Sequence, residues 1–284
     1  MEKAVNQFIN GQSGKISVRS KGIENSKSND IIVMVQGANI SGQLGFDFSF
    51  PKGKDYSFMD AMVSEGIGAI TFSIRGYAES ELSGSPLEVQ TDQAIEDLVS
   101  VVEWLRTKEN YRINLLGWSW GGRIVGRYAE KNSDKIHKLI LLDPALGGGQ
   151  LILPAPKEEW WNNTYNYYFN RLEDEFTELD ARKALAKQAE TNEPKSPNGI
   201  RQENALGSIP VEPKRIKNST LMLYGSSAGA QDYMKGSSPR TEFFEKLDVN
   251  SKSLSVISGG GDYAHLQDPR QEIHKIVADF TTQT

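Results

Sequence analysis

The chain has 284 residues, carries a formal net charge of -5 and contains no cysteine. The acidic balance argues against nucleic acid or an anionic membrane surface as the main partner, and the lack of cysteine excludes disulfides, a thiol nucleophile and cysteine-ligated metal centres. Residues 1–15 show no apolar core of a secretory signal, and no apolar run approaches the ~20 residues of a membrane span. We therefore expect a cytoplasmic protein without a membrane span.

Apolar runs predict buried strands that alternate with amphipathic helices. Strands are expected at Ile16–Val18, Ile31–Val35, Ile67–Ile74, Arg112–Leu116, Leu139–Leu142, Leu221–Tyr224 and Leu254–Ile257. Helices are expected at Phe58–Val63, Ile95–Leu105, Ile124–Asn132, Pro239–Leu247 and Pro269–Phe280. This alternation is typical of an α/β protein with a mostly parallel sheet covered on both faces.

One tight turn, between the strand at Arg112–Leu116 and the following helix, carries a serine between glycines. The stretch reads Gly-Trp-Ser-Trp-Gly-Gly, and its serine is Ser119. The small residues let the backbone cross close to its neighbours, and a strained turn of this kind raises the Ser119 hydroxyl above the sheet. The N–H group of Trp120 then lies at a helix N-terminus, where developing negative charge is stabilised.

This turn resembles the nucleophile elbow of the α/β-hydrolase family. A second segment, Ser73–Ser80, reads Ser-Ile-Arg-Gly-Tyr-Ala-Glu-Ser and is similar to the family segment Asp-x-Arg-Gly-x-Gly-x-Ser. The resemblance implies a mostly parallel sheet of about eight strands flanked by helices, Ser119 as the nucleophile, and a helical cap inserted after the sixth strand. We therefore expect a core of residues 1–145 and 217–284 and a cap of residues 146–216.

The expected cap carries an aromatic stripe. Apolar residues over Trp161–Leu179 recur at spacings of three and four, which predicts one long amphipathic helix. The stretch Lys195–Pro213 is rich in proline and glycine and is expected to be irregular. The stripe either packs the cap on the core, which we favour, or lines an apolar substrate pocket. The candidates for substrate contacts are Gly37, Trp118, Trp161 and Tyr165.

A serine nucleophile needs a base, and histidine is the usual one because its pKa is near 6.5. Of the three histidines, His137 lies in a Lys/His/Lys run and His274 lies within the last predicted helix. His265 follows the glycine run Gly259–Gly261, between the last strand and the last helix, where the family carries its catalytic histidine. The resemblance therefore implies His265 as the base.

The acid of the implied triad is where the sequence departs from the family. The family often carries Gly-x-x-Asp after the seventh strand, but here Gly225 leads to Ala228. Asp232, in the same loop, and Asp143, at the end of the sixth strand, are the two alternatives, and we favour Asp232. Asp262 is disfavoured because it lies too close to His265 in sequence. A triad without an acid is a further option, since the oxyanion hole sustains some catalysis.

The implied oxyanion hole has two backbone donors. Trp120, directly after Ser119, supplies one N–H group. The second comes from the loop after Ile31–Val35, where the family carries His-Gly-x and this chain carries Gln-Gly-Ala. Ala38 therefore donates, and Gln36 replaces the family histidine.

The resemblance implies a serine hydrolase that cleaves a carboxylic ester, thioester or lactone of a small to medium, partly apolar substrate through an acyl-enzyme. The alternatives are an amide or peptide hydrolase similar to proline iminopeptidases, a carbon–carbon bond hydrolase, or a non-hydrolytic ligand-binding member with an altered triad. No phosphate-binding glycine motif is present, so we expect no cofactor, no metal and a small molecule as the partner. A homo-oligomer is compatible with this composition.

Overall fold

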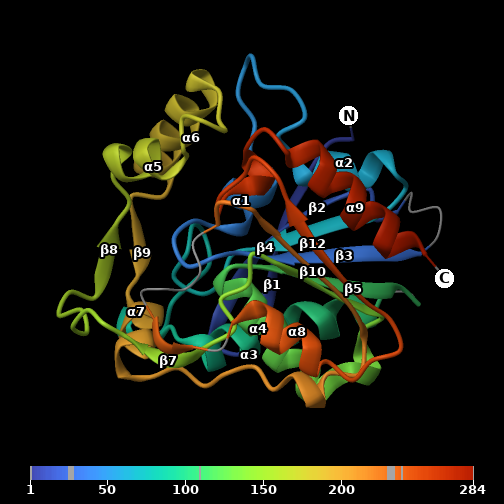
Figure 1. The fold of residues 1–284 in the computed structure, drawn as a ribbon. Coiled ribbons are helices and arrows are strands. Elements are labelled where there is room, and N and C mark those ends of the chain that lie inside the picture. The colour runs from blue at the N-terminus through green and yellow to red at the C-terminus, as the bar shows by residue number, and fades with distance from the viewer. Residues whose placement is uncertain (1, 25–28, 109, 229–233, 238, 284) are drawn as a thin grey trace.

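An eight-stranded sheet forms the centre of the molecule, and helices cover both of its faces (Figure 1). The computed structural model describes residues 2–24, 29–108, 110–228, 234–237 and 239–283. In spatial order the strands are β1 (Val5–Gly11), β2 (Gly14–Lys21), β4 (Gly68–Phe72), β3 (Asp30–Val35), β5 (Arg112–Trp118), β6 (Lys138–Leu142), β10 (Ser219–Gly225) and β12 (Lys252–Ile257). β1 and β2 run antiparallel at one edge, and the strands from β4 to β12 are parallel. The structure confirms the predicted fold class.

The central strands are buried on both sides, as their continuous apolar runs predict. All six residues of β3 are buried. Because side chains alternate across a strand, Ile31 and Val33 enter one hydrophobic core and Ile32 and Met34 enter the other. The sheet therefore separates two cores, and each core is closed by its own layer of helices.

The helices divide between the two faces. One face carries α3, α4 and α8, and the other carries α2 and α9, as Figure 1 shows. The bounds of the helices beside the sheet are α1 (Gly42–Phe46), α2 (Phe58–Ser64), α3 (Thr91–Arg106), α4 (Trp120–Asn132), α8 (Arg240–Lys246) and α9 (Arg270–Thr282). Short 3-10 helices lie at Pro86–Glu88, Ser133–Lys135, Pro213–Arg215 and Ala264–Leu266.

The family-like segment after β4 is tied to α3 by a buried ion pair. Arg75 donates from Nε and Nη2 to the carboxylate of Asp97, and its backbone N–H donates to the same carboxylate at 2.9 Å. Both side chains are buried. Burial raises the pKa of Asp97 although the guanidinium opposes that change. The contact fixes the segment and does not reach the pocket described below.

The chain between β6 and β10 leaves the sheet and returns to it. It contains β7 (Gly148–Leu151), β8 (Trp160–Asn162), α5 (Tyr165–Arg171), α6 (Leu179–Asn192), β9 (Lys195–Pro197) and α7 (Gly199–Leu206). β8 pairs antiparallel with β9, and β7 pairs with β11 (Met234–Ser237). In Figure 1, α5 and α6 stand at the upper left, at the end of the two strands β8 and β9.

Two predictions for this region are wrong. The stretch Trp161–Leu179 is not one helix: it begins in β8, forms α5 and then breaks before α6. Thr164 starts α5 by accepting a hydrogen bond from the N–H group of Tyr167, and Leu172 ends it with extended backbone angles. The helical spacing of apolar residues continues across the end of α5, because Tyr168 inside the helix and Leu172 just beyond it are both buried.

The stretch Lys195–Pro213 is also more regular than predicted, since it holds β9 and α7. Gly199 begins α7 directly against the chain at Val89. A Cβ atom there would lie 2.3 Å from the Val89 carbonyl oxygen, so glycine is required by this contact rather than by a flexible loop.

Two further observations bear on the predictions. No helix within the described part of the chain is long and apolar enough to cross a membrane. The favoured triad acid, Asp232, lies outside the described residues.

Candidate functional site

The turn at Ser119 has the strained backbone that the sequence predicts. Ser119 joins β5 to α4 with a φ of 53° and a ψ of -116°. Its N–H group donates to the carbonyl of Leu142 at 3.0 Å, and its own carbonyl accepts from Gly122 and Ala145 at 2.9 Å each. These bonds hold an angle that a non-glycine residue rarely adopts, and strain of this kind gathers at functional sites.

The glycines on either side of the turn are required by close packing. A Cβ atom on Gly117 would lie 2.2 Å from the carbonyl oxygen of Gly121. A Cβ atom on Gly121 would lie 2.2 Å from the carbonyl oxygen of Val35, in the neighbouring strand β3. Helix α4 therefore starts as close to the sheet as backbone atoms allow, with its first N–H groups next to Ser119.

Ser119 lines a pocket of about 400 Å³ above the carboxyl ends of the parallel strands. Of the predicted contact residues, Gly37, Ala38, Trp118 and Trp161 also line it. Tyr165 is not among its lining residues, and its ring stacks on Phe169 with 5.7 Å between the ring centroids. The remaining lining residues are Asn39, Asp143, Ala145, Leu151, Leu153, Tyr167, Arg171, Arg201, Asn204, Arg240, Asp262 and Tyr263.

The pocket contains two carboxylate–guanidinium pairs. Arg240 Nη2 lies 2.7 Å from Asp143 Oδ1, and Arg171 donates to Asp262. The first pair is close but poorly aligned, since Asp143 Oδ1 accepts no well-directed hydrogen bond from a described residue. Burial raises the pKa of Asp143 to about 7, although Arg240 opposes that change. This carboxyl group therefore exchanges its proton near neutral pH.

Asp143 lies next to Ser119 because of the strand register. Trp118 of β5 pairs with Leu142 of β6, so the residues that follow these two leave the sheet side by side. Asp143 also has a positive φ, 44°, and its N–H group donates to Leu223 of β10. The structure thus brings Ser119 and Asp143, which was predicted as an alternative acid, into one pocket.

His265 is not brought into this pocket. It belongs to the 3-10 helix Ala264–Leu266, and its side chain is buried in the core between the sheet, α1 and α2. The imidazole lies 4.6 Å from the indole of Trp118 and 5.7 Å from the ring of Phe46, measured between centroids. Trp118 does line the pocket, so the histidine lies one side chain away from it.

The surroundings of His265 are those of a neutral core residue. Neither ring nitrogen has a hydrogen-bond partner among the described residues. Burial, aided by the nearby His274, lowers the pKa of the imidazole to about 3. A catalytic base requires hydrogen-bond reach to the nucleophile and a pKa near the working pH, and His265 has neither in this arrangement.

The other two histidines are also outside the pocket. His137 is exposed at the start of β6, where burial of part of its ring lowers its pKa. His274 is buried on α9, and its ring packs on Phe58 at 4.3 Å. All three histidines belong to the described residues, and none lines the pocket of Ser119.

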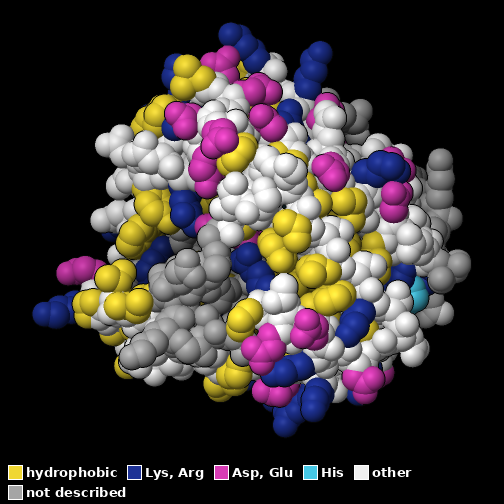
Figure 2. Space-filling model, viewed as in Figure 1, with side chains coloured by type: hydrophobic (Ala, Val, Ile, Leu, Met, Phe, Trp, Pro, Cys, Tyr) yellow, Lys and Arg dark blue, Asp and Glu magenta, His cyan; other side chains and the backbone are white. Residues whose placement is uncertain are grey.

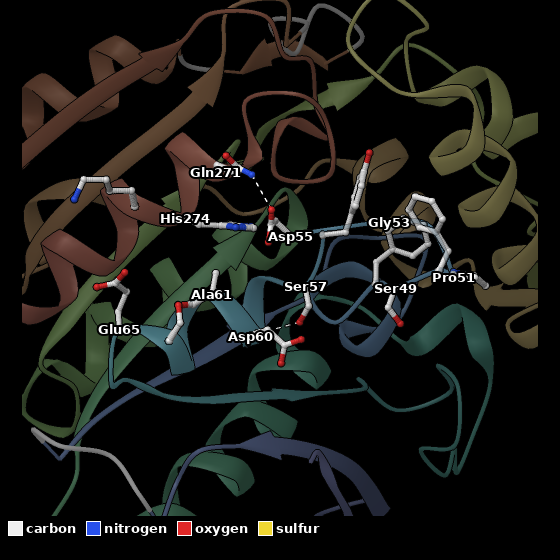
Figure 3. A pocket seen from close by; sticks show the side chains of 15 residues that line it. Ser49, Pro51, Gly53, Asp55, Ser57, Asp60, Ala61, Glu65, Gln271 and His274 are labelled. Carbon is white, nitrogen blue, oxygen red and sulfur yellow. Dashed lines mark hydrogen bonds between the residues drawn. The ribbon is translucent and has the colours of Figure 1, made fainter. Parts of the chain in front are cut away.

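A larger cavity, of about 610 Å³, lies on the face covered by α2 and α9 (Figure 3). Figure 3 shows Gln271 pointing at Asp55, to which it donates at 2.9 Å. His274 lines this cavity, together with Ser57 and Asp60. One lining residue, Asp55, has a positive φ of 60°, but its carboxylate accepts the Gln271 hydrogen bond, and no serine of this cavity has a strained backbone. The smaller pocket at Ser119 is therefore the candidate active site.

The loop after β3 is held by Gln36 and by the chain between β6 and β10. Gln36 Oε1 accepts hydrogen bonds from Gly42 at 3.1 Å and Ile74 at 3.2 Å, which is how it substitutes for a histidine at this position. Asn39 donates to the hydroxyl of Tyr167 at 2.9 Å, and its carbonyl accepts from Asn163 at 3.1 Å.

A carboxylate completes the attachment of this loop. Ser41 donates to Glu193 from both its backbone N–H group, at 2.7 Å, and its hydroxyl. Glu193 is buried, and burial raises its pKa. We call residues 37–41 the β3–α1 loop; the contacts of Asn39 and Ser41 join it to the turn between β8 and α5, to α5 itself and to the C-cap of α6.

The described residues hold no group of three or more His, Asp or Glu side chains that could bind a metal ion.

Comparison with known proteins agrees with this geometry. The family model described as "alpha/beta hydrolase fold" matches residues 49–220. The chain belongs to the α/β-hydrolase family. An uncharacterized 31.7 kDa protein from the traX-finO intergenic region of Escherichia coli is 30% identical over 105 residues, which cover 36% of this chain and 35% of that protein. The match thus spans about a third of the curated relative.

Solved structures show how widely this α/β-hydrolase shares its fold. An esterase from Exiguobacterium antarcticum superposes with a TM-score of 0.70 at 18% identity, over 98% of this chain and 100% of that one. A bromoperoxidase from Bacillus anthracis superposes with a TM-score of 0.69 at 17% identity, over 98% of this chain and 100% of that one. At such identities the likeness establishes the fold alone.

The arginines of the pocket were not predicted from the sequence, and Asp262 was considered only as a disfavoured triad acid. Arg171, Arg201 and Arg240 come from α5, α7 and α8, which are far apart along the chain. Asp262 had one available signal: it directly follows the glycine run at the carboxyl end of β12, where residues of a parallel sheet meet the active site. His265 lies three residues further on, and the 3-10 turn points it into the core.

Proposed function

We propose that this α/β-hydrolase cleaves a carboxylic ester or thioester of a small to medium, partly apolar substrate, with Ser119 as the nucleophile. The observation that carries the proposal is the strained Ser119 backbone inside a closed-in pocket at the N-terminus of α4. The N–H groups of Trp120 and Ala38 are the proposed oxyanion donors. An esterase is among the solved structures with this fold.

We assign the role of base to Asp143 rather than to His265. What supports this is that Asp143 lines the pocket of Ser119 and has a pKa of about 7, whereas His265 is buried outside it with a pKa of about 3. The ionised carboxylate takes the hydroxyl proton as Ser119 Oγ bonds to the acyl carbon. Arg240 keeps part of the carboxyl population ionised at neutral pH.

The remaining steps follow from the same two residues. The tetrahedral oxyanion collapses, and the protonated Asp143 returns its proton to the departing alcohol or thiol. A water molecule then attacks the acyl-enzyme, giving its proton to Asp143, and the released Ser119 oxygen takes that proton back. The products are a carboxylic acid and the alcohol or thiol, and the enzyme is restored.

The test is hydrolysis of p-nitrophenyl acetate, butyrate and octanoate by the wild type and four variants. Ser119→Ala should lose at least about 1,000-fold in kcat, and Asp143→Asn at least about 100-fold. His265→Gln should keep activity in proportion to the folded fraction, which circular dichroism measures. Asp232→Asn tests the acid originally favoured from the sequence and should have little effect.

The outcomes separate the two base assignments. A folded His265→Gln protein without activity, beside an active Asp143→Asn protein, would show that the histidine is the base and would refute the role of Asp143. Labelling of the wild type, but not of Ser119→Ala, by a fluorophosphonate would establish an activated serine. An unlabelled wild type would refute the hydrolase proposal.

A second candidate is a non-hydrolytic member that binds a ligand. This candidate is favoured by the residues that line the pocket, which include three arginines and none of the three histidines of the chain. Absence of both labelling and ester hydrolysis, together with ligand binding in the pocket, would identify this alternative.

A further inference from the structure

The pocket around Ser119 carries one more positive charge than its described lining residues neutralise. Two of its three arginines face carboxylates, Arg240 with Asp143 and Arg171 with Asp262. Arg201 lines the same pocket, but its hydrogen-bond acceptors among the described residues are the neutral amide oxygens of Asn39 and Asn198. No described carboxylate forms an ion pair with it. A charge withdrawn from water without a partner is unfavourable, so such an arginine is normally kept for a ligand.

The guanidinium of Arg201 is held in a fixed place. Its plane lies over the indole of Trp161, with 4.1 Å from Cζ to the ring centroid. Nη2 donates to Asn39 at 2.5 Å and Nη1 to Asn198 at 3.2 Å. A guanidinium has five N–H donors in a planar fork, and these two bonds leave several of them for a ligand. Arg201 is half-buried, and burial lowers its pKa, which agrees with a charge partly removed from water.

The rest of the lining fits an organic anion. Trp118, Trp161 and Tyr263 provide aromatic walls, and Leu151 and Leu153 add aliphatic surface at the rim. In Figure 2, Lys and Arg side chains lie between hydrophobic ones at the centre and left of the face shown. A volume of about 400 Å³ suits a small ligand with both an apolar part and a charged end.

We infer that Arg201 binds a carboxylate or phosphate group of the substrate, separate from the bond that is cleaved. That this ligand is a substrate rests on the proposed function. The substrate class is then an ester or thioester that carries a second, negatively charged group. Two oxygens of a carboxylate or phosphate group can accept two parallel hydrogen bonds from the guanidinium, which an apolar chain end cannot do. Arg201 would therefore determine specificity and take no part in bond cleavage.

The kinetic test compares two esters with equal acyl carbon counts, mono-p-nitrophenyl adipate and p-nitrophenyl hexanoate. The wild type should prefer the charged ester by about 10-fold or more in kcat/KM, because hydrogen bonds to charged groups are strong in a desolvated site. Arg201→Gln should lose that ratio. Arg127→Gln is the matched control, since Arg127 pairs with Asp92 at 2.8 Å and does not line the pocket. It should keep the ratio.

A binding measurement separates failure of this inference from failure of the proposed function. Calorimetry at low ionic strength would use adipate and inorganic phosphate as probes on the wild type, Arg201→Gln, Arg201→Lys and Arg127→Gln. Binding lost at least about 10-fold in Arg201→Gln and partly restored in Arg201→Lys supports an oxyanion site, and the tighter probe shows whether carboxylate or phosphate is its natural ligand.

The same measurements can also contradict the role of Arg201. No binding of either probe to the wild type, or equal binding by Arg201→Gln, would overturn the inference even if neutral esters are hydrolysed. Arg201-dependent binding without any ester hydrolysis would uphold the oxyanion site and refute the hydrolase proposal. If Arg201→Gln fails to fold, the ratio of the two esters in Arg201→Met decides, because this variant removes the charge and keeps an unbranched side chain. A ratio equal to that of the wild type would then count against the inference.

Discussion

The carboxyl group of Asp143 should make the stability of the wild type fall between about pH 4 and pH 7. Its side chain is 5% exposed, and burial raises its pKa from the ordinary 3.8 to about 7. In the unfolded chain the pKa returns to its ordinary value. Between those two values the folded state therefore holds a proton that the unfolded state has lost, and the stability present at low pH disappears as the pH rises through 7.

The size of the effect follows from the two pKa values. A difference between 3.8 and about 7 corresponds to about 4 kcal/mol, since one pKa unit is worth about 1.4 kcal/mol. Asp143→Asn removes this dependence because an amide does not ionise. The variant also leaves Arg240 without its carboxylate, but an arginine stays charged over this range, so that loss is a constant offset.

Urea unfolding at pH 4.5, 5.5, 6.5, 7.5 and 8.5 measures the prediction. The free energy of unfolding of the variant, relative to the wild type, should rise by a few kcal/mol from the lowest to the highest pH. Asp174→Asn is the control: that carboxylate is 85% exposed, and its substitution should give a flat difference. A difference for Asp143→Asn that stays constant within about 1 kcal/mol would refute both the raised pKa and the argument for Asp143 as a base near neutral pH.

Three further substitutions test the packing around the site. Gly121→Ala places a Cβ atom 2.2 Å from the Val35 carbonyl oxygen, so it should lower stability by about 3 kcal/mol or abolish folding, and an unchanged thermal midpoint would contradict the close contact. Arg75→Met should cost about 3–5 kcal/mol in urea unfolding because it leaves Asp97 buried and unpaired, whereas the double variant with Asp97→Leu should recover much of that loss; equal losses would argue against the ion pair. His265→Phe removes two buried nitrogens without partners and should be neutral or stabilising at pH 7.5. Since the pKa of His265 is about 3 in the fold and 6.5 when unfolded, its own contribution to stability falls as the pH drops below 6.5, opposite in sign to that of Asp143. The stability of His265→Phe relative to the wild type should therefore rise as the pH falls, and a constant difference would speak against a buried neutral imidazole.

The sheet could be predicted from the sequence because its signals are local. A run such as Leu139–Leu142 is apolar on both faces and matches β6 to within one residue. The turn at Ser119 could be predicted for the same reason, since six adjacent residues determine it. The region between β6 and β10 could not, because the apolar spacing through Leu172 continues across a break in the helix that only tertiary packing reveals.

The charged part of the site depends on contacts that no local pattern records. Arg201 and Arg240 reach the pocket from separate helices. The contacts that each side chain makes there are with residues distant in the sequence. The orientation of His265 depends on a single 3-10 turn after β12, which the glycine run permits but does not specify. A sequence motif can therefore predict the loop that carries a residue without predicting whether its side chain points into the pocket or into the core.

The attachment of the β3–α1 loop has a consequence for how a molecule enters the pocket. Asn39 and Ser41 are bound to Tyr167, Asn163 and Glu193, so the loop that presents the Ala38 N–H group and the segment over the pocket form one mechanical unit. If that segment swings aside to admit a molecule, the same hydrogen bonds must stretch or break. Under the proposed function, in which Ala38 donates to the oxyanion, such a movement would also displace that donor, so substrate entry and the alignment of the Ala38 N–H group would be coupled.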